Sequence, residues 1–224
     1  MNKFLFPIYA VVLGLIIARF SKNSKSLNTK LLLAFSGAFL MALTLFDLLP
    51  EVYHEVNTKV TGLLIMSGIL LQIVLEFFSK GAEHGHIHLH KEATTFPWLL
   101  FISLCLHSFL EGFPIHQHND MVYGVLIHKI PIATLLGLFL FQSNYSKVQV
   151  ALFLIVFGIM TPLGTFISNE IDILLQYVPY INAIVIGIFF HISTTILFET
   201  GEGHKFNLSK LIAIILGVGI AFMF

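Results

Sequence analysis

Eight long apolar stretches dominate this chain of 224 residues. A helix needs about 20 mainly apolar residues to cross a bilayer, and roughly 17 to 25 are tolerated. The stretches that meet or approach this length are 4–20, 30–49, 60–78, 96–115, 121–141, 148–168, 173–198 and 206–224. We therefore predict an all-α membrane protein with eight transmembrane helices in a single domain, 1–224, and a tilt or a break near Pro179 in the seventh span.

The composition supports a bilayer as the solvent of this fold. Hydrophobic residues make up 57% of the chain and charged residues 11%, against roughly 25% charged in soluble domains. The formal net charge is zero, so nothing indicates a nucleic-acid partner. We expect an integral, multi-pass protein whose partners are the lipid bilayer and a metal ion, in the inner (plasma) membrane of a bacterium. The sequence does not fix the oligomeric state, and a homodimer is considered as one assembly.

Lysine and arginine predict the orientation of the spans. The loops and span ends on one side of an eight-span chain hold nine of these residues, and the other side holds only Lys3 and Lys59. Cytoplasmic loops carry the excess of positive charge. This split places both termini outside the cytosol and a His-rich loop, 79–95, inside it.

Ionisable residues in the fourth and fifth spans predict a metal site. His107 and Glu111 are four residues apart, so they share one helical face with Ser108 beside them. His107 and His128 each lie roughly ten residues, or about 15 Å, from the short turn that joins the two spans. Two imidazoles and a carboxylate at one depth can bind a divalent metal. Pro114 follows in the fourth span, and proline weakens a helix near such sites.

Other polar residues are weaker candidates. Asp47, Glu51 and His54 end the second span, either as a metal entrance shared with His116, His118 and Asp120 or as a solvated helix end. At the cytosolic side the candidates for a metal exit are His191, Glu199 and His204, which ordinary helix packing and interfacial solvation also explain. Glu76 is interpreted as interfacial. The loop carries His84, His86, His88 and His90 at every second residue, which favours loose metal capture over an incidental linker.

Short motifs in four spans are similar to those of the ZIP (Zrt/Irt-like) family of divalent-metal transporters. The fourth span reads HSFLEG from His107, where the family has His-Asn-x-x-(Glu/Asp)-Gly. The fifth reads HKIPI from His128, the second DLLPE from Asp47, and the sixth TPLG from Thr161. The resemblance implies eight helices in a 3+2+3 arrangement with inverted repeats, both termini extracytoplasmic, and transport of zinc toward the cytosol through a site between spans 4 and 5.

The departures from these motifs cluster on the second metal of the family's two-metal centre. Ser108 replaces Asn, Lys129 and Ile132 replace acidic or His residues, and Thr161 replaces Glu. The resemblance implies that His107, Glu111 and His128 are the primary ligands, so we predict a mononuclear site. We also hypothesise that Lys129 pairs with Glu111 in place of the second metal and exchanges a proton as metal binds; snorkelling of Lys129 away from the site is the alternative.

The function that fits best is therefore transport of zinc, with cadmium, iron or manganese as other substrates, and not catalysis. Two alternatives stay open at this point. In an intramembrane zinc hydrolase, Glu111 would act as a general base on a metal-bound water, but the sequence has no HExxH stretch. A metal sensor that does not transport is the other, although the short loops leave little room for an output surface.

Overall fold

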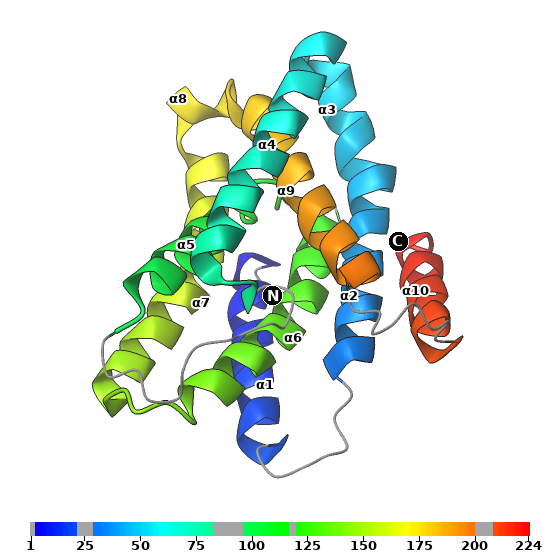
Figure 1. The fold of residues 1–224 in the computed structure, drawn as a ribbon. Helices are drawn as coiled ribbons and strands as arrows, with labels where there is room; N and C mark the ends of the chain where they lie inside the picture. Colours follow the sequence, from blue (N-terminus) through cyan, green and yellow to red (C-terminus); the bar gives the residue numbers. More distant parts are fainter. Residues whose placement is uncertain (1–2, 22–28, 83–95, 117–119, 200–207) are drawn as a thin grey trace.

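Helices make up most of the residues that the computed structural model describes, which are 3–21, 29–82, 96–116, 120–199 and 208–224 (Figure 1). Within these ranges there is no strand, which confirms the all-α class. The elements are η1 Lys3–Leu5, α1 Phe6–Ser21, α2 Thr29–Leu43, η2 Thr44–Leu48, α3 Leu49–Glu55, α4 Thr58–Ser79, α5 Trp98–Leu110, α6 Met121–Leu140, α7 Lys147–Glu170, α8 Asp172–Leu175, α9 Val178–Glu199 and α10 Leu208–Ala221.

Apolar helices occupy each of the eight predicted places, but they differ in length. Among the described residues, five helical runs are long and apolar enough to cross a bilayer: Thr29–Glu55, α4, α6, α7 and Val178–Phe198. The other three, α1, α5 and α10, are apolar but have only 16, 13 and 14 residues. Eight crossings, the 3+2+3 arrangement and the sides of the termini therefore stay predictions.

The interior of the bundle is built around α2, α6 and α9. Helix α2 packs against α6, α9 and α10, while α1 packs on α6, α4 on α9, and α5 on α7. Phe39 of α2, Val125 of α6 and Phe189 of α9 are fully buried in one cluster. Large apolar side chains such as Leu63 and Ile155 face outward, which suits a lipid environment.

The second span is longer than predicted, because the helix passes through Pro50 and ends at Glu55 instead of Leu49. A proline inside a helix loses one backbone hydrogen bond and crowds the preceding turn. Here the turn before it is a π-helix, in which the N–H of Leu49 bonds to the carbonyl of Thr44. The wider turn accommodates Pro50 and carries Asp47.

Two other boundaries depend on prolines. Helix α5 ends at Leu110 instead of residue 115, because Pro114 cannot continue it and the N–H groups of Gly112 and Phe113 bond three residues back. In the seventh span, α8 and α9 are separate helices, so the predicted break near Pro179 is confirmed. By contrast, α6 continues through Pro131.

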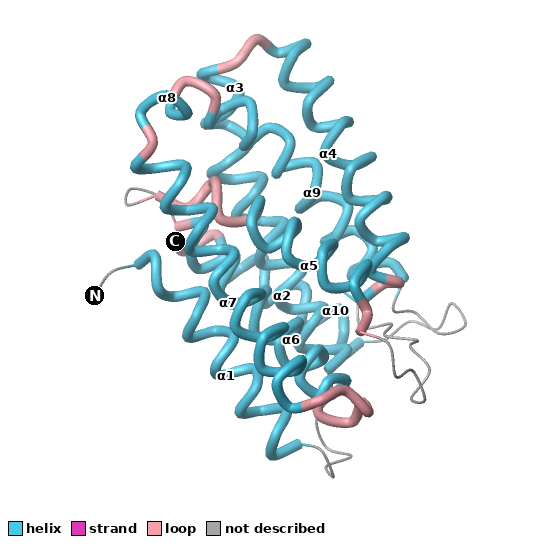
Figure 2. The backbone as a smooth tube through the Cα atoms, turned by 90° about the vertical axis from the view of Figure 1, so that its left-hand side faces the viewer, coloured by secondary structure: helices cyan, strands magenta, loops and turns pink. Residues whose placement is uncertain are grey.

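The turns divide between two opposite ends of the bundle. The α3–α4 turn and α8 lie at one end, and the α6–α7 turn and the end of α1 at the other (Figure 2). Arg19 and Lys147 belong to the second end and Lys59 to the first. This arrangement agrees with the division of basic residues from which the orientation was predicted.

Candidate metal centre

The centre forms where α5 ends against α7. Glu111 is the C-terminal cap of α5, and its N–H bonds to the carbonyl of His107 at 3.0 Å. The next residue must be glycine, because a Cβ on Gly112 would overlap the carbonyl oxygen of Thr161 in α7. A Cβ on Gly164 would likewise overlap the carbonyl oxygen of Phe109. The two glycines let the helices approach closely, so Glu111 lies directly beside α7.

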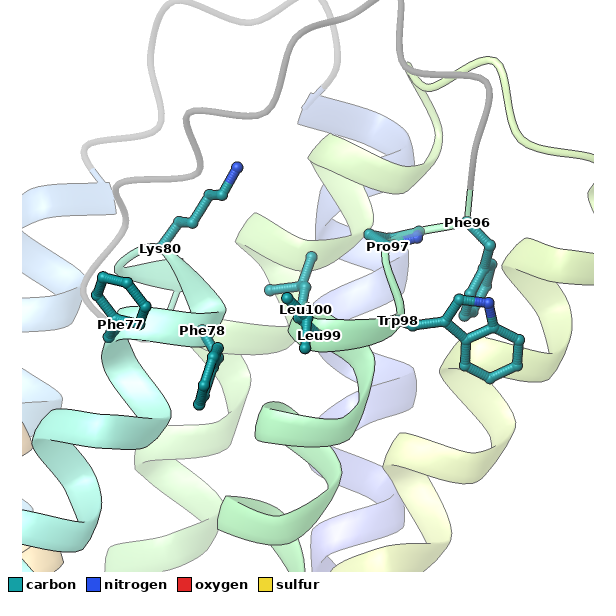
Figure 3. A pocket seen from close by; sticks show the side chains of 8 residues that line it. All are labelled: Phe77, Phe78, Lys80, Phe96, Pro97, Trp98, Leu99 and Leu100. Atoms are coloured by element: carbon teal, nitrogen blue, oxygen red, sulfur yellow. The ribbon is translucent and has the colours of Figure 1, made fainter.

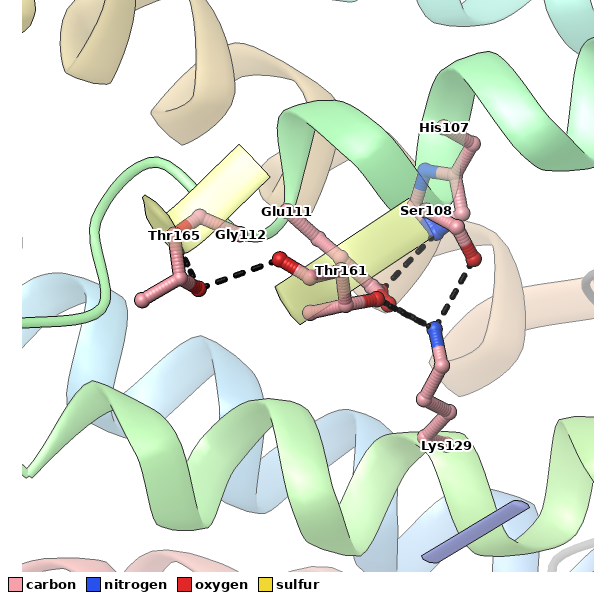
Figure 4. Close-up of polar contacts among 7 residues, drawn as sticks. All are labelled: His107, Ser108, Glu111, Gly112, Lys129, Thr161 and Thr165. Atoms are coloured by element: carbon pink, nitrogen blue, oxygen red, sulfur yellow. Dashed lines mark hydrogen bonds and ion pairs between the residues drawn. The ribbon is translucent and has the colours of Figure 1, made fainter. Parts of the chain in front are cut away.

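Lys129 lies at the middle of a buried polar network (Figure 4). Its ammonium donates to the hydroxyl of Ser108 at 2.8 Å, to that of Thr161 at 2.7 Å and to Oε1 of Glu111. Thr161 in turn donates to the same carboxylate oxygen at 2.7 Å. The ammonium also lies 4.5 Å from the ring centroid of Phe157. The pairing expected for Lys129 and Glu111 is therefore present, and Lys129 does not snorkel outward.

This network is almost closed to solvent. Lys129 and Glu111 are each 1% exposed, and Ser108 and Thr161 are fully buried. Charges taken out of water are stable only when they are paired and fully hydrogen-bonded. The ammonium has two hydroxyls and a carboxylate as partners, so the pair meets this condition. Lys129 thus contacts two of the positions, Ser108 and Thr161, at which the chain lacks the family's ligands.

His107 borders the other oxygen of the Glu111 carboxylate, and His128 lies beside His107. Nε2 of His107 lies 3.5 Å from Oε2 of Glu111, and the ring centroids of His107 and His128 are 6.3 Å apart. The two imidazoles predicted to lie at one depth are therefore close to each other. In the described part of the chain, no three His, Cys, Asp or Glu side chains already surround a single point. A metal at these residues would therefore require at least one side chain to move.

Some residues of the centre were not predicted from the sequence. Phe157 was not considered, and its place one turn before Thr161 on α7 is the signal that could have identified it. Thr165, one turn further on, donates to the carbonyl of Gly112 at 2.9 Å. This bond satisfies backbone that the end of α5 leaves without a helical partner.

At the α3 end of the bundle, part of the predicted entrance comes together. Nε2 of His116 lies 3.3 Å from Oε1 of Glu51, and Asp47 is within electrostatic range of Glu51 and Asp120. His54 is exposed, and no contact places it with this group. His118 lies outside the described residues.

On the opposite half, the prediction for Glu76 needs correction. Glu76 of α4 is not a simple interfacial residue, because its Oε2 lies 2.5 Å from Nε2 of His191 in α9. Among the predicted exit residues, the structure thus gives His191 a partner, Glu76, whereas the side chain of Glu199 is not described. His204 and the loop residues His84, His86, His88 and His90 lie outside the described ranges.

The chain is similar to known zinc transporters. The sequence model of the family described as ZIP zinc transporter matches residues 79–224. Zinc transporter ZIP1 of Danio rerio is 34% identical over 88 residues, which are 37% of this chain and 29% of that protein. Zinc transporter ZIP1 of Takifugu rubripes is 29% identical over 150 residues, 62% of this chain and 50% of that protein. Protein zntD of Dictyostelium discoideum is 28% identical over 110 residues.

The matched part of the chain corresponds to no more than half the length of these relatives. All three come from eukaryotes, so they do not support the expected bacterial inner membrane. The family whose sequence model matches is one of transporters and not of enzymes. That match covers well over half of the chain, from the end of α4 to the last residue. The chain therefore belongs to the ZIP zinc transporter family.

Proposed function

We propose that this protein carries zinc across the membrane toward the cytosol through a mononuclear site formed by His107, Glu111 and His128. The observation that carries the proposal is that the two oxygens of the Glu111 carboxylate have different partners. Oε1 is held by Lys129 and Thr161, whereas Oε2 faces the imidazole of His107. One oxygen is thus committed to the protein and the other is directed toward a candidate ligand.

The spacing of the two candidate ligands suits zinc. Bonds from zinc to nitrogen or oxygen are about 2.0–2.2 Å, so two ligands of a tetrahedral ion lie roughly 3.3–3.6 Å apart. The 3.5 Å between His107 Nε2 and Glu111 Oε2 falls in this range and is long for a hydrogen bond. Movement of the His128 ring toward them would supply a third ligand and leave a fourth position open.

In this proposal Lys129 takes the place of a second metal. Its ammonium supplies one fixed positive charge beside Glu111, where a divalent ion would supply two. The carboxylate is therefore compensated before the transported ion arrives, and the incoming ion competes with the ammonium for its charge. Such competition weakens binding, which suits a site that must release its ion.

Two further groups extend the path in opposite directions. Glu51 and His116, with Asp47 nearby, would attract cations at the outer end. Glu76 and His191 would receive the ion on the inner half. Zinc is the proposed substrate. Whether cadmium, iron and manganese are also transported is tested by their competition with zinc for uptake. A homodimer and the direction of transport are also parts of the proposal.

Uptake of radioactive zinc into proteoliposomes tests the central claim. We expect uptake above that of empty vesicles, and its loss in the His107→Ala and His128→Ala variants. His191→Ala is expected to slow uptake while the zinc affinity of the central site stays unchanged. His54→Ala is the matched control, because His54 is exposed. If the unmodified protein binds zinc but takes up none, it is a metal sensor and not a carrier.

A further inference from the structure

A cavity of about 640 Å³ opens at the end of the bundle that holds the α6–α7 turn. Its volume lies within the range of about 300–1,000 Å³ that is common for ligand pockets. Arg19 from the last turn of α1 and Lys147 from the first turn of α7 line it. The other lining residues include Ser143 and Tyr145 of the α6–α7 turn, Leu140 at the end of α6 and Leu154 of α7. It is separate from the metal centre, because none of the centre's residues lines it.

The lining of this cavity is positively charged on one part and apolar on the other. Arg19 and Lys147 are exposed cations, and no acidic residue is among the lining residues described. Leu140 and Leu154 are 2% and 9% exposed, so they form a packed apolar wall. Burial raises the pKa of Tyr145, so its phenol keeps its proton and can donate a hydrogen bond to an anion. An occupant that matches both parts has an anionic head and an apolar tail.

We propose that this cavity binds one anionic phospholipid of the adjacent leaflet, with its phosphate between Arg19 and Lys147 and an acyl chain along Leu140 and Leu154. Charge complementarity favours this occupant, because basic pockets between membrane helices on the cytosolic side bind anionic lipid heads. The position also fits, because the distribution of basic residues assigns this end of the bundle to the cytosol. The proposal goes beyond zinc transport and does not depend on it.

A second cavity on the molecule provides an internal comparison. It has about 650 Å³ and lies between the end of α4 and the start of α5. Phe77, Phe78 and Trp98 line it, and Lys80 is the one cation among its described lining residues. The Lys80 side chain extends away from the aromatic rings (Figure 3). The two cavities have similar volumes but differ in charge, so Lys80→Gln is a matched control.

Native mass spectrometry of the whole chain with added lipids tests the proposal. We expect phosphatidylglycerol to be retained over phosphatidylcholine by roughly 25-fold, which is about fivefold for each cation. The Arg19→Gln/Lys147→Gln variant should lose this preference, and Lys80→Gln should keep it. Ala151 also lines the cavity. Ala151→Trp would place a large ring there and leave both cations in place, so this variant should also lose phosphatidylglycerol.

Three results would overturn the proposal. Equal retention of the two lipids by the unmodified protein would show that the charge of the head does not matter. If Lys80→Gln lost the preference for phosphatidylglycerol as fully as the Arg19→Gln/Lys147→Gln variant, the lipid would be held by general attraction to a basic surface. Displacement of phosphatidylglycerol by sn-glycerol 3-phosphate at the same concentration would identify a soluble phosphate as the occupant. The Arg19→Lys/Lys147→Arg variant should retain the lipid and thereby separates loss of charge from a failure to fold.

Discussion

At the scale of single residues, Lys129 determines the electrostatics of the centre. Its replacement by methionine keeps much of the side-chain volume but leaves Glu111 buried without its cation. Breaking a buried ion pair typically costs about 3–5 kcal/mol. We therefore expect Lys129→Met to lower the free energy of unfolding by that order in the absence of metal, and to bind zinc more tightly because the ion no longer competes with an ammonium.

Thermal unfolding with and without zinc measures both effects of this substitution. Lys59→Met is the control, because Lys59 is exposed beside the α3–α4 turn and is not part of the metal centre. The double variant Glu111→Gln/Lys129→Met should recover part of the lost stability, since it removes both charges. Unaltered zinc affinity and unaltered pH dependence of uptake in Lys129→Met would contradict the idea that Lys129 replaces a second metal.

The sequence predicts contacts between residues on neighbouring spans better than contacts between distant ones. The proximity of His107, Glu111, His128 and Lys129 follows from a short turn and the rise of a helix. The pair Glu76–His191 joins residues 115 positions apart. No spacing rule relates α4 to α9, and their contact depends on how the whole bundle packs. A carboxylate and an imidazole in separate spans therefore gave no signal of their partnership.

At the scale of elements, the close approach of α5 and α7 positions Glu111 beside Lys129. Gly112→Ala and Gly164→Ala would each force a Cβ against a backbone carbonyl, which cannot rotate aside. Overpacking of this kind typically costs about 1–3 kcal/mol. We expect both variants to lower the unfolding temperature and to weaken zinc binding, because the end of α5 must move away from α7.

Two other glycines serve as controls for this prediction. Gly62 and Gly219 lie in helices, and a Cβ at either position meets nothing within 4 Å. Alanine there should raise stability slightly, by up to about 1 kcal/mol, because glycine is the poorer helix former. If all four alanine variants behaved alike, the contact between α5 and α7 would not be what positions Glu111.

The sequence also located helices better than helix ends. Apolar runs correctly indicate where the helices are, but such a run can extend beyond the last residue that makes helical hydrogen bonds. The predicted span continued to residue 115, yet Gly112 and Pro114 end α5 at Leu110. Conversely, the second span was predicted to end before Pro50, but the π-helical turn lets the helix continue through this proline. The bounds depended on local backbone geometry, which hydropathy does not report.

At the scale of the whole molecule, the distribution of basic residues predicts which end faces the cytosol. The chain has one native cysteine, Cys105, which is 7% exposed. In a Cys105→Ser background, single cysteines at Lys59 and Ser146 mark the opposite ends of the bundle. We expect a membrane-impermeant maleimide to label Lys59→Cys in intact cells and Ser146→Cys only after the membrane is opened. The reverse pattern would invert the predicted orientation.

The same labelling decides whether α10 crosses the membrane. This helix has 14 residues, or about 21 Å at the rise of an α-helix, and a hydrocarbon core is about 30 Å thick. The predicted eighth span needs the residues on both sides of α10 to complete the crossing. Met223 is 85% exposed near the last residue, so Met223→Cys reports on that end directly. With eight spans it is labelled in intact cells, like Lys59→Cys. If Met223→Cys were labelled only after the membrane is opened, like Ser146→Cys, both ends of α10 would lie on the cytosolic side. In that case seven spans would cross the membrane.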